Sequence, residues 1–319
     1  MHALPFDKPG QFYRGNLHTH STRSDGRLSP EAVIDAYRAR GYDFISLTDH
    51  FLPNSHFRSG EQGFATVSDT TGLRSGEFTT ILGAEIHGPG MENGEQWHLV
   101  ANGLPLDFAP WTPGETGPRI AKRAVDAGAY VTIAHPSWNG LSVKDAMDVI
   151  DTVHGVEIYN TGCDVEVDRG NGWHFTDILL GMGHRLTAIA TDDAHVIDPP
   201  EPVADAFGGW VRVKAESLDP DALLATLKAG WFYSSTGPEI HDVRIAKGEM
   251  SIACSPAQRV IVTGLGARSD REHGTPGQPI QTRTIPIERF TAGGYCRVTV
   301  IDAAGKRAWT NPIWLDDLR

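Results

Sequence analysis

At 319 residues the chain has room for one large domain, or for one large and one small domain. Its 40 acidic against 28 basic residues give a formal net charge of -12, which argues against a nucleic-acid-binding surface, although a nucleotide remains acceptable as a small substrate. There is no apolar run of membrane-spanning length, no amino-terminal signal-like segment and no cysteine spacing typical of disulfides, so we expect a cytoplasmic protein that binds neither membranes nor nucleic acid stably.

Two histidines stand where a first strand is predicted to end. The largely apolar residues 12–17 predict the strand, and His18 and His20 follow it as a His-x-His pair. Residues i and i+2 of a strand point to the same face, so both imidazoles are aimed at one point. Asp25 comes next, in a Ser-Asp-Gly turn. The alternative for this segment alone is a surface strand with an ordinary turn aspartate.

A helix and a second strand follow this turn. Ser29 is suited to cap the helix, Pro30 to occupy its first position and Gly41 to end it. Residues 44–47 are typical of a buried strand, which stops at a Thr-Asp-His motif that ends in His50. The segment is therefore predicted to be a βαβ unit with metal-binding side chains at the carboxyl ends of its strands.

The same arrangement recurs further along the chain. Helices are predicted over residues 113–128, 142–151 and 173–182, among strands over residues 79–84, 97–100, 130–134, 155–159 and 186–190. Glu85, His135, Asn160, Asp193 and His195 stand at or just after the ends of these strands, and His98 stands at the start of one. Strands that alternate with helices imply a parallel sheet, open or closed, and functional groups at several carboxyl ends are what a barrel active site requires.

Three further segments belong to this α/β part. Residues 51–78 are rich in Gly, Ser, Thr and Asp without a sustained period, and they form either a variable loop or a substrate lid. Residues 210–214 predict one more strand, and residues 219–230 predict a capped helix.

The pattern changes near Pro238. Short β-type runs are found over residues 243–245, 251–254, 260–263, 284–287 and 295–301, with a hairpin signal at residues 302–305 and no helical pattern between them. They predict a small antiparallel sandwich or sheet packed on the preceding part. We therefore place an α/β domain at residues 1–238 and a C-terminal all-β domain at residues 239–319.

The candidate metal ligands are imidazoles and carboxylates, without a cysteine. They are His18, His20, Asp25, His50, Glu85, His98, His135, Asp193 and His195. Because a catalytic zinc takes about three protein ligands, this set suits two or three divalent ions better than one. Glu85 is suited to bridge two ions because a carboxylate has two oxygens. Mixed nitrogen and oxygen donors favour Mn, Zn or Fe over Ca or Mg.

These motifs, in this order, resemble the PHP family, the polymerase and histidinol phosphatase superfamily. The resemblance covers residues 12–235 and includes His-x-His, Ser-Asp-Gly, Thr-Asp-His, Gly-x-Glu, a His that opens a strand, Ala-His-Pro and a final Asp-x-His. It implies a distorted (β/α)7 barrel with a trinuclear metal centre. The tail, from Gly-Tyr-Cys-Arg-Val-Thr-Val to Arg-Ala-Trp-Thr-Asn-Pro-Ile-Trp, resembles the branch that includes carbaryl-hydrolase-like enzymes.

Transferred residue by residue, the resemblance implies three metal positions. The first would take His18, His20, Glu85 and Asp193, the second Glu85, His98 and His135, and the third Asp25, His50 and His195. Glu85, Asp193 and His195 are expected to take a direct part in catalysis. Family members often have a histidine where Asp25 stands, and a carboxylate there shifts the third position towards a harder cation.

The chemistry expected of such a site is hydrolysis. Two ions roughly 3.5–4 Å apart can hold a bridging hydroxide, and they neutralise charge that builds on phosphoryl oxygens. A phosphoesterase that acts on a small phosphorylated substrate is the leading hypothesis. Hydrolysis of aryl carbamates or carboxylic esters by the same site is the alternative, and a non-catalytic metal-binding scaffold is the second alternative. The sequence indicates no oligomeric state.

Several other residues receive roles at this stage. Substrate contacts are predicted at Arg23, Arg58, Trp138 and Asn160. Asp49 and Asp192, which precede ligand candidates, are expected either to orient ligands or to cap turns. Glu157 is either a site carboxylate or a buried structural one. His87, two residues past Glu85, either points beside Glu85 or lacks a partner, and we expect the second.

Overall fold

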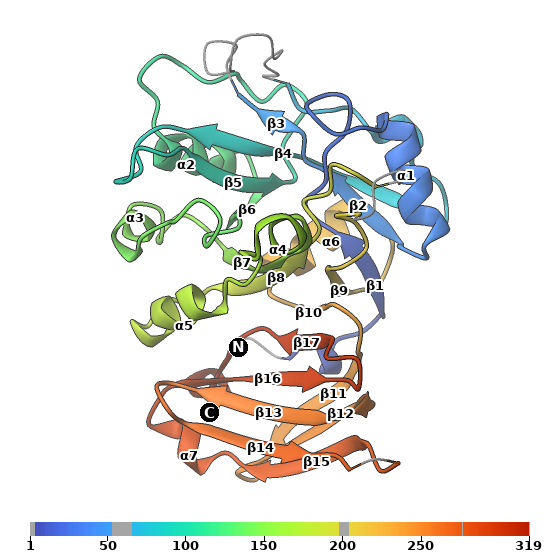
Figure 1. The fold of residues 1–319 in the computed structure, drawn as a ribbon, viewed down its shortest axis with the longest axis vertical. Coiled ribbons are helices and arrows are strands. Elements are labelled where there is room, and N and C mark those ends of the chain that lie inside the picture. The colour runs from blue at the N-terminus through green and yellow to red at the C-terminus, as the bar shows by residue number, and fades with distance from the viewer. Residues whose placement is uncertain (1–3, 53–65, 198–203, 276, 319) are drawn as a thin grey trace.

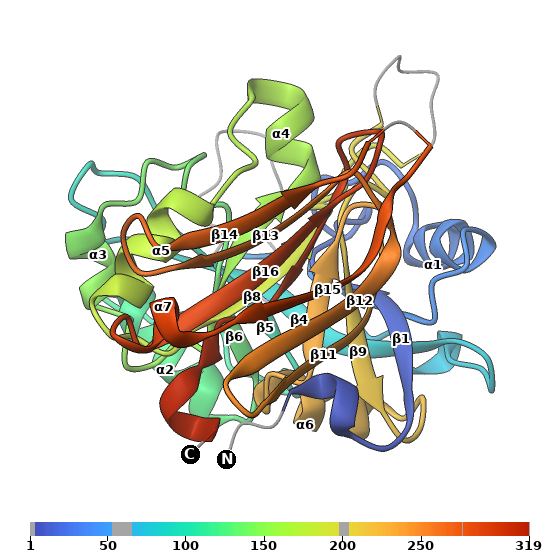
Figure 2. The same cartoon turned by 90° about the horizontal axis from the view of Figure 1, so that it is seen from below.

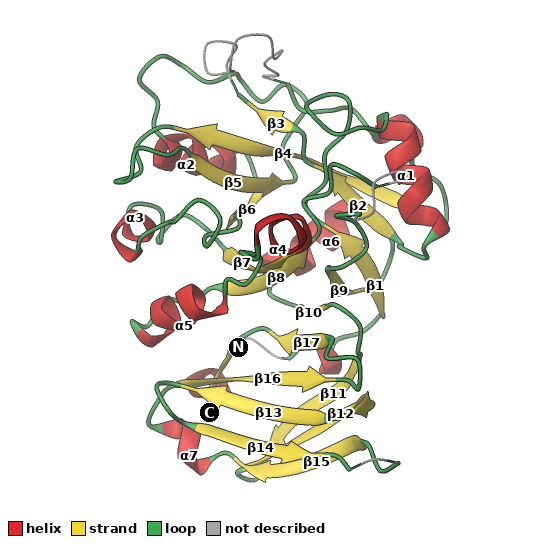
Figure 3. Ribbon diagram, viewed as in Figure 1, coloured by secondary structure: helices red, strands yellow, loops and turns green. Residues whose placement is uncertain are grey.

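The molecule has a part rich in both helices and strands, and a part built almost wholly of strands (Figures 1 and 3). A computed structural model describes residues 4–52, 66–197, 204–275 and 277–318. It has a mixed α/β architecture with one large sheet and one small sheet. Within the described residues, no helix combines the length and apolar character needed to cross a membrane.

The α/β part contains the first ten strands. They are β1 (Gln11–Asn16), β2 (Phe44–Leu47), β3 (His50–Phe51), β4 (Thr79–Gly88), β5 (Trp97–Asn102), β6 (Tyr130–Ile133), β7 (Gly155–Asn160), β8 (Thr187–Thr191), β9 (Trp210–Ala215) and β10 (Phe232–Ser235). Their order in the sheet is β10-β9-β1-β2-β4-β5-β6-β7-β8, and β3 pairs with β4. The sequence predicted all of these except β10 and the short β3.

The sheet is not wholly parallel, contrary to the expectation from alternating strands and helices. β1 and β2 are parallel, whereas β5 pairs antiparallel with both β4 and β6. The physical reason is the connection, because β4 and β5 are joined by the short segment 89–96, which contains no helix to carry the chain back across the sheet. This reversal places the amino end of β5, with His98, beside the carboxyl end of β4.

Hydrogen bonds join the segment after β8 to the segment after β1, and β8 itself to β10. His18 O accepts from the backbone of Asp193, and the backbone of His20 donates to Ala194 O, both at 2.9 Å. Ser234 Oγ of β10 donates to Ala188 O at 2.8 Å, on β8. These bonds bring the segments after β1 and β8 together, although a closed seven-stranded barrel stays a prediction.

The described helices are α1 (Pro30–Ala39), α2 (Gly117–Asp126), α3 (Val143–Met147), α4 (Thr161–Val167), α5 (Trp173–Gly181), α6 (Pro220–Lys228) and α7 (Glu288–Thr291). Helix α1 begins as predicted, because Ser29 Oγ accepts from the backbone of Ala32 at 3.4 Å. Its buried face includes Val33, Ile34 and Tyr37. The sequence analysis did not predict α4 or α7.

The remaining strands are antiparallel and lie in two layers, seen from below in Figure 2. One layer holds β11 (Ile240–Ala246), β12 (Glu249–Ala257) and β15 (Ile280–Pro286). The other holds β13 (Arg259–Gly264), β14 (Ser269–His273), β16 (Tyr295–Ile301), β17 (Arg307–Thr310) and β18 (Ile313–Trp314). Because β17 pairs with β10, this second layer continues the large sheet. The division at residue 238 therefore stays a prediction.

Candidate metal centre

Glu85 lies at the centre of a buried group of histidines. It stands near the end of β4 and its side chain is 1% exposed. Its Oε1 lies 2.8 Å from His98 Nδ1 and 3.2 Å from His135 Nε2. Its Oε2 lies 2.6 Å from His50 Nδ1. The two oxygens of one carboxylate thus face different imidazoles, which is the arrangement that a bridging ligand requires.

A second carboxylate faces the His-x-His pair that follows β1. Asp193 Oδ1 lies 3.1 Å from His18 Nε2 and 2.9 Å from His20 Nε2. The same two nitrogens each lie 3.7 Å from Glu85 Oε2. Asp193 holds the left-handed backbone conformation, with φ of 55°, directly after β8. Glu85 and Asp193 therefore enclose both imidazoles between two strand ends.

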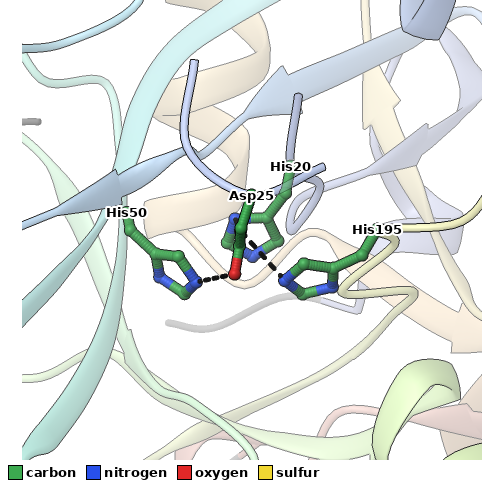
Figure 4. Close-up of side chains that lie close together, drawn as sticks. All are labelled: His20, Asp25, His50 and His195. Atoms are coloured by element: carbon green, nitrogen blue, oxygen red, sulfur yellow. Dashed lines mark ion pairs between the residues drawn. The ribbon is translucent and has the colours of Figure 1, made fainter. Parts of the chain in front are cut away.

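Asp25 gathers the third group of side chains (Figure 4). Its Oδ2 lies 3.3 Å from His50 Nε2, and its Oδ1 lies 3.4 Å from His195 Nε2 and 3.9 Å from His20 Nδ1. The Asp25 side chain is 57% exposed, so this group is the most open to solvent of the three. All nine predicted ligands are thus brought to one place. That they bind metal ions stays a prediction.

The donor set fits divalent cations. Ligand atoms within 4.8 Å of one another occur in the sets His20–Asp25–His50–His195, His18–His20–Glu85, His50–Glu85–His87 and Glu85–His98–His135. In addition, His18 Nε2 and His135 Nδ1 are buried without a hydrogen-bond partner among the described residues. His18 Nε2 faces Asp193 Oδ1 at 3.1 Å and Glu85 Oε2 at 3.7 Å. Buried polar atoms are normally satisfied, and a cation between this nitrogen and the two carboxylates is the kind of partner that would satisfy it.

The charges within the cluster agree with this fit. Burial alone would raise the pKa of Glu85, but the surrounding imidazoles, His87 foremost, lower it well below its usual range. Burial lowers the pKa of His50, yet Glu85 and Asp25 outweigh burial and raise that pKa to about 10. Burial and neighbouring imidazoles lower the pKa of His20 to about 4. The carboxylates therefore stay ionised inside the protein, and metal ions can replace the protons that the imidazoles hold beside them.

Glu157 on β7 supports two of the imidazole-bearing residues. Its Oε1 lies 2.7 Å from His18 Nδ1, and its Oε2 accepts from the backbone of His135 at 2.8 Å. Asn160 donates to Glu157 Oε2 at 3.0 Å and to Asp193 Oδ2 at 3.1 Å. Because Asn160 is fully buried and its amide group is used in this way, the structure supports a positioning role for Asn160 and gives no support to the predicted substrate contact.

Asp49 and Asp192 brace the backbone around the cluster. Asp49 accepts from the backbone of Ser21 at 2.7 Å and from Ser24 Oγ at 2.9 Å. These bonds hold the turn that contains Asp25 in place. Asp192 accepts from Tyr37 Oη at 2.7 Å and from three consecutive backbone N–H groups of residues 207–209. Both carboxylates hydrogen-bond to segments that bear ligand candidates. Within the described part of the chain, neither is hydrogen-bonded to an imidazole.

A cavity of about 430 Å³ opens onto these side chains. Trp138 forms part of its wall, 39% exposed, with its ring centroid 5.1 Å from that of His135. Arg27 and Glu166 also line the cavity, whereas Arg23 is an exposed residue of the same loop that does not. Arg58 lies outside the described residues, as do residues 53–65 of the predicted loop or lid over residues 51–78.

His87 has partners that the sequence analysis did not expect. It is buried in β4, and its Nε2 lies 2.8 Å from His50 Nδ1 and 3.2 Å from Glu85 Oε2. The expectation that it lacks a partner is therefore wrong. The available signal was the period of two along a strand, which places residues 85 and 87 on the same face.

Among the comparisons with known proteins, one solved structure supports this fold. No protein-family model and no curated protein matches the chain. A solved two-domain protein from Bacteroides vulgatus, containing a predicted PHP-like metal-dependent phosphoesterase, matches with a TM-score of 0.54 and 16% identity, over 96% of this chain and 97% of its own. An amidohydrolase from Chromobacterium violaceum matches with a TM-score of 0.41 and 17% identity, over 57% of this chain and 87% of its own.

The first of these matches covers both parts of the molecule. It confirms, at the level of the fold, the resemblance to PHP-like metal-dependent phosphoesterases. The resemblance of the tail to the carbaryl-hydrolase-like branch stays a prediction.

Proposed function

We propose that this protein is a metal-dependent phosphoesterase with a di- or trinuclear centre of Mn, Zn or Fe. The observation that carries the proposal is the position of Glu85, because each of its two oxygens lies within 3.2 Å of a different set of imidazole nitrogens. A buried carboxylate shared in this way is suited to hold two divalent ions close together. The fold match to a PHP-like protein supports the same reaction class.

The side chains divide the work at such a centre. His18, His20 and Asp193 would hold one ion with Glu85, and His98 and His135 would hold a second on its other oxygen. Asp25, His50 and His195 would hold a third near the cavity. When bound, these ions would activate water and neutralise negative charge on the ester oxygens. Glu157 and Asn160 keep the imidazole of His18 and the carboxylate of Asp193 in place.

The cavity supports a small substrate with a phosphoryl group. Its volume of about 430 Å³ suits a small molecule better than a folded partner. Arg27, which lines the cavity, is placed to contact an oxygen that points away from the cluster. We include in the proposal a distorted (β/α)7 barrel for residues 1–238, supported by the bonds between the segments after β1 and β8, and a β-sandwich-like domain for residues 239–319.

Hydrolysis of an aryl carbamate or carboxylic ester is the second candidate function. Trp138 favours it, because this indole forms part of the cavity wall beside His135 and His98 and offers a face for an aromatic leaving group. The same cluster could carry out either reaction, so only the class of substrate that the protein hydrolyses distinguishes the two candidate functions.

Metal content and one activity screen test the proposal. The purified protein would be analysed for Mn, Zn and Fe, then assayed with each metal against an aryl phosphomonoester, an aryl phosphodiester, an aryl carbamate and an aryl acetate. We expect two to three ions per chain and turnover mainly of a phosphoester. Carbamate or acetate turnover without phosphoester turnover would favour the second candidate. A metal-free chain without turnover would contradict both and favour a scaffold.

A further inference from the structure

His87 lies behind the candidate metal centre. It is two residues past Glu85 on β4, and it pairs with His98 across the antiparallel β4–β5 ladder. Its side chain is 4% exposed, and it does not line the cavity. The function proposed above gives it no role, although its Nε2 lies only 2.8 Å from Nδ1 of His50.

His50 faces two different groups with its two ring nitrogens. Nε2 lies 3.3 Å from Asp25 Oδ2, whereas Nδ1 lies between His87 Nε2 and Glu85 Oε2. A neutral imidazole has one lone pair and one N–H group. If Nε2 binds an ion beside Asp25, Nδ1 must bear the proton and needs an acceptor.

Two acceptors compete for that proton. Glu85 Oε2 lies 2.6 Å away and His87 Nε2 lies 2.8 Å away. Glu85 Oε2 is also directed at the His-x-His pair, with 3.7 Å to His18 Nε2. An oxygen that ligates an ion there is a weaker acceptor for a further hydrogen bond, because the ion draws on its electron density. His87 Nε2 is the alternative acceptor, and it lies closer to His50 Nδ1, at 2.8 Å, than to Glu85 Oε2, at 3.2 Å.

We propose that His87 is a positioning residue that accepts a hydrogen bond from Nδ1–H of His50. This bond fixes the tautomer in which His50 offers Nε2 to the ion beside Asp25 and His195. It also leaves Glu85 Oε2 available to the ions that Glu85 bridges. The inference rests on the proposed metal centre, and it adds a residue outside the predicted ligand set.

Two substitutions separate positioning from ligation. His87→Gln keeps an acceptor in the form of the amide oxygen, whereas His87→Leu removes it. We would titrate Co²⁺ into the apoproteins and follow the stepwise affinity and the visible absorption spectrum. We expect His87→Leu to bind the last ion about 10–100-fold more weakly, as is usual when the partner of a ligating histidine is lost. His87→Gln should stay close to the wild type, and the saturated spectra should agree.

Different outcomes would overturn the inference. Equal weakening in both variants, with altered saturated spectra, would make His87 a direct ligand. Unchanged affinity in His87→Leu would leave His87 a packing residue. His241→Gln is the matched control, because His241 is a half-exposed histidine of β11 that should affect no ion.

A measurement on the wild type keeps the test independent of how the variants fold. In the Zn²⁺-loaded, ¹⁵N-labelled protein we expect a scalar coupling between His50 Nδ1 and His87 Nε2 across the N–H···N bond. A proton on Nδ1 without this coupling would assign the bond to Glu85 and reject the inference. If the wild type binds ions but hydrolyses no phosphoester, the proposed function fails while these measurements still decide the role of His87.

Discussion

Glu85 combines two properties that suit a bridging ligand. It is almost fully buried, and both of its oxygens lie within 3.2 Å of imidazole nitrogens. Glu85→Gln preserves the shape of the side chain, removes its charge and turns one oxygen into a donor group. Both bridged positions would be weakened by this change, whereas His50→Ala removes one ligand from the third position alone.

We therefore expect Glu85→Gln to lower kcat by more than the roughly 100-fold that loss of a group supporting a metal ligand costs. His50→Ala should lower kcat less. The measurement is turnover of an aryl phosphoester at saturating metal, with circular dichroism to show that both variants are folded. A folded Glu85→Gln protein with near wild-type turnover would remove Glu85 from the bridging position.

Asp25 gives a separate prediction, because it brings charge to the more exposed group of ligands. Asp25→Asn keeps the size of the side chain and removes that charge. We expect the last ion to bind more weakly and kcat to fall, while the other ions are retained, since Glu85 and Asp193 are untouched. Stepwise metal titration of the apo variant measures this. Wild-type affinity at every step would show that Asp25 is a turn residue and not a metal ligand.

Single residues show what the sequence could and could not establish. The nine ligand candidates could be named because most stand at or just after a strand end, Asp25 follows the first pair in a turn, and the residue types are those that bind metals. The depth of a side chain was not predictable: Asn160, for which a substrate contact was predicted, is fully buried. The contact of His87 with His50 depends on the pairing of β3 with β4. The residues of either strand alone do not predict this pairing.

At the scale of elements, one carboxylate joins several strand ends. Glu157 on β7 contacts His18 after β1 and the backbone of His135 after β6, and it accepts from Thr191 Oγ1 on β8 at 2.8 Å. Its position is therefore fixed by the sheet, and its charge in turn holds the imidazole of His18 with Nε2 towards Asp193. This is the arrangement that orients metal-binding histidines in other proteins.

We expect Glu157→Gln to lower metal affinity by about 10–100-fold and to leave the secondary structure unchanged, because the amide keeps the shape but has only one accepting oxygen. Competition against a chelator measures the affinity, and circular dichroism checks the fold. Glu166→Gln is the control, since Glu166 lines the cavity without contacting His18. Unchanged affinity in Glu157→Gln would show that its charge does not support the cluster.

The elements that the sequence analysis missed have identifiable physical causes. Helix α4 is only seven residues long, and its cap is Asn160, whose side chain accepts from the backbone of Cys163. Such a helix has too few turns to show an apolar period. The antiparallel direction of β5 follows from a short connection, which is visible in the sequence but was not used. The strong patterns, such as the capped α1 and the apolar β2, were predicted to within a residue or two.

At the scale of the whole molecule, the tail is attached to the α/β part by more than one kind of contact. Strand β17 pairs with β10, and Tyr295 and Trp309 of the tail are buried in the same core cluster as Trp173. Arg297 on β16 makes two bonds to the carboxylate of Asp177 on α5, at 3.0 and 2.7 Å. Its guanidinium also lies 3.8 Å from the centroid of the Trp173 ring.

We expect Arg297→Leu to destabilise the protein without changing its chemistry. Hydrogen bonds to charged groups contribute about 1.5–3 kcal/mol, and for a chain of this size that predicts a fall in Tm on the order of 5 °C. Metal content and kcat should stay at wild-type values because no predicted ligand lies beyond His195. Arg244→Leu is the matched control. The Arg244 side chain is 66% exposed and forms an ion pair with Asp242. Such exposed pairs contribute little to the free energy of unfolding. A loss of turnover in folded, metal-loaded Arg297→Leu would instead show that the tail influences the metal centre through α5.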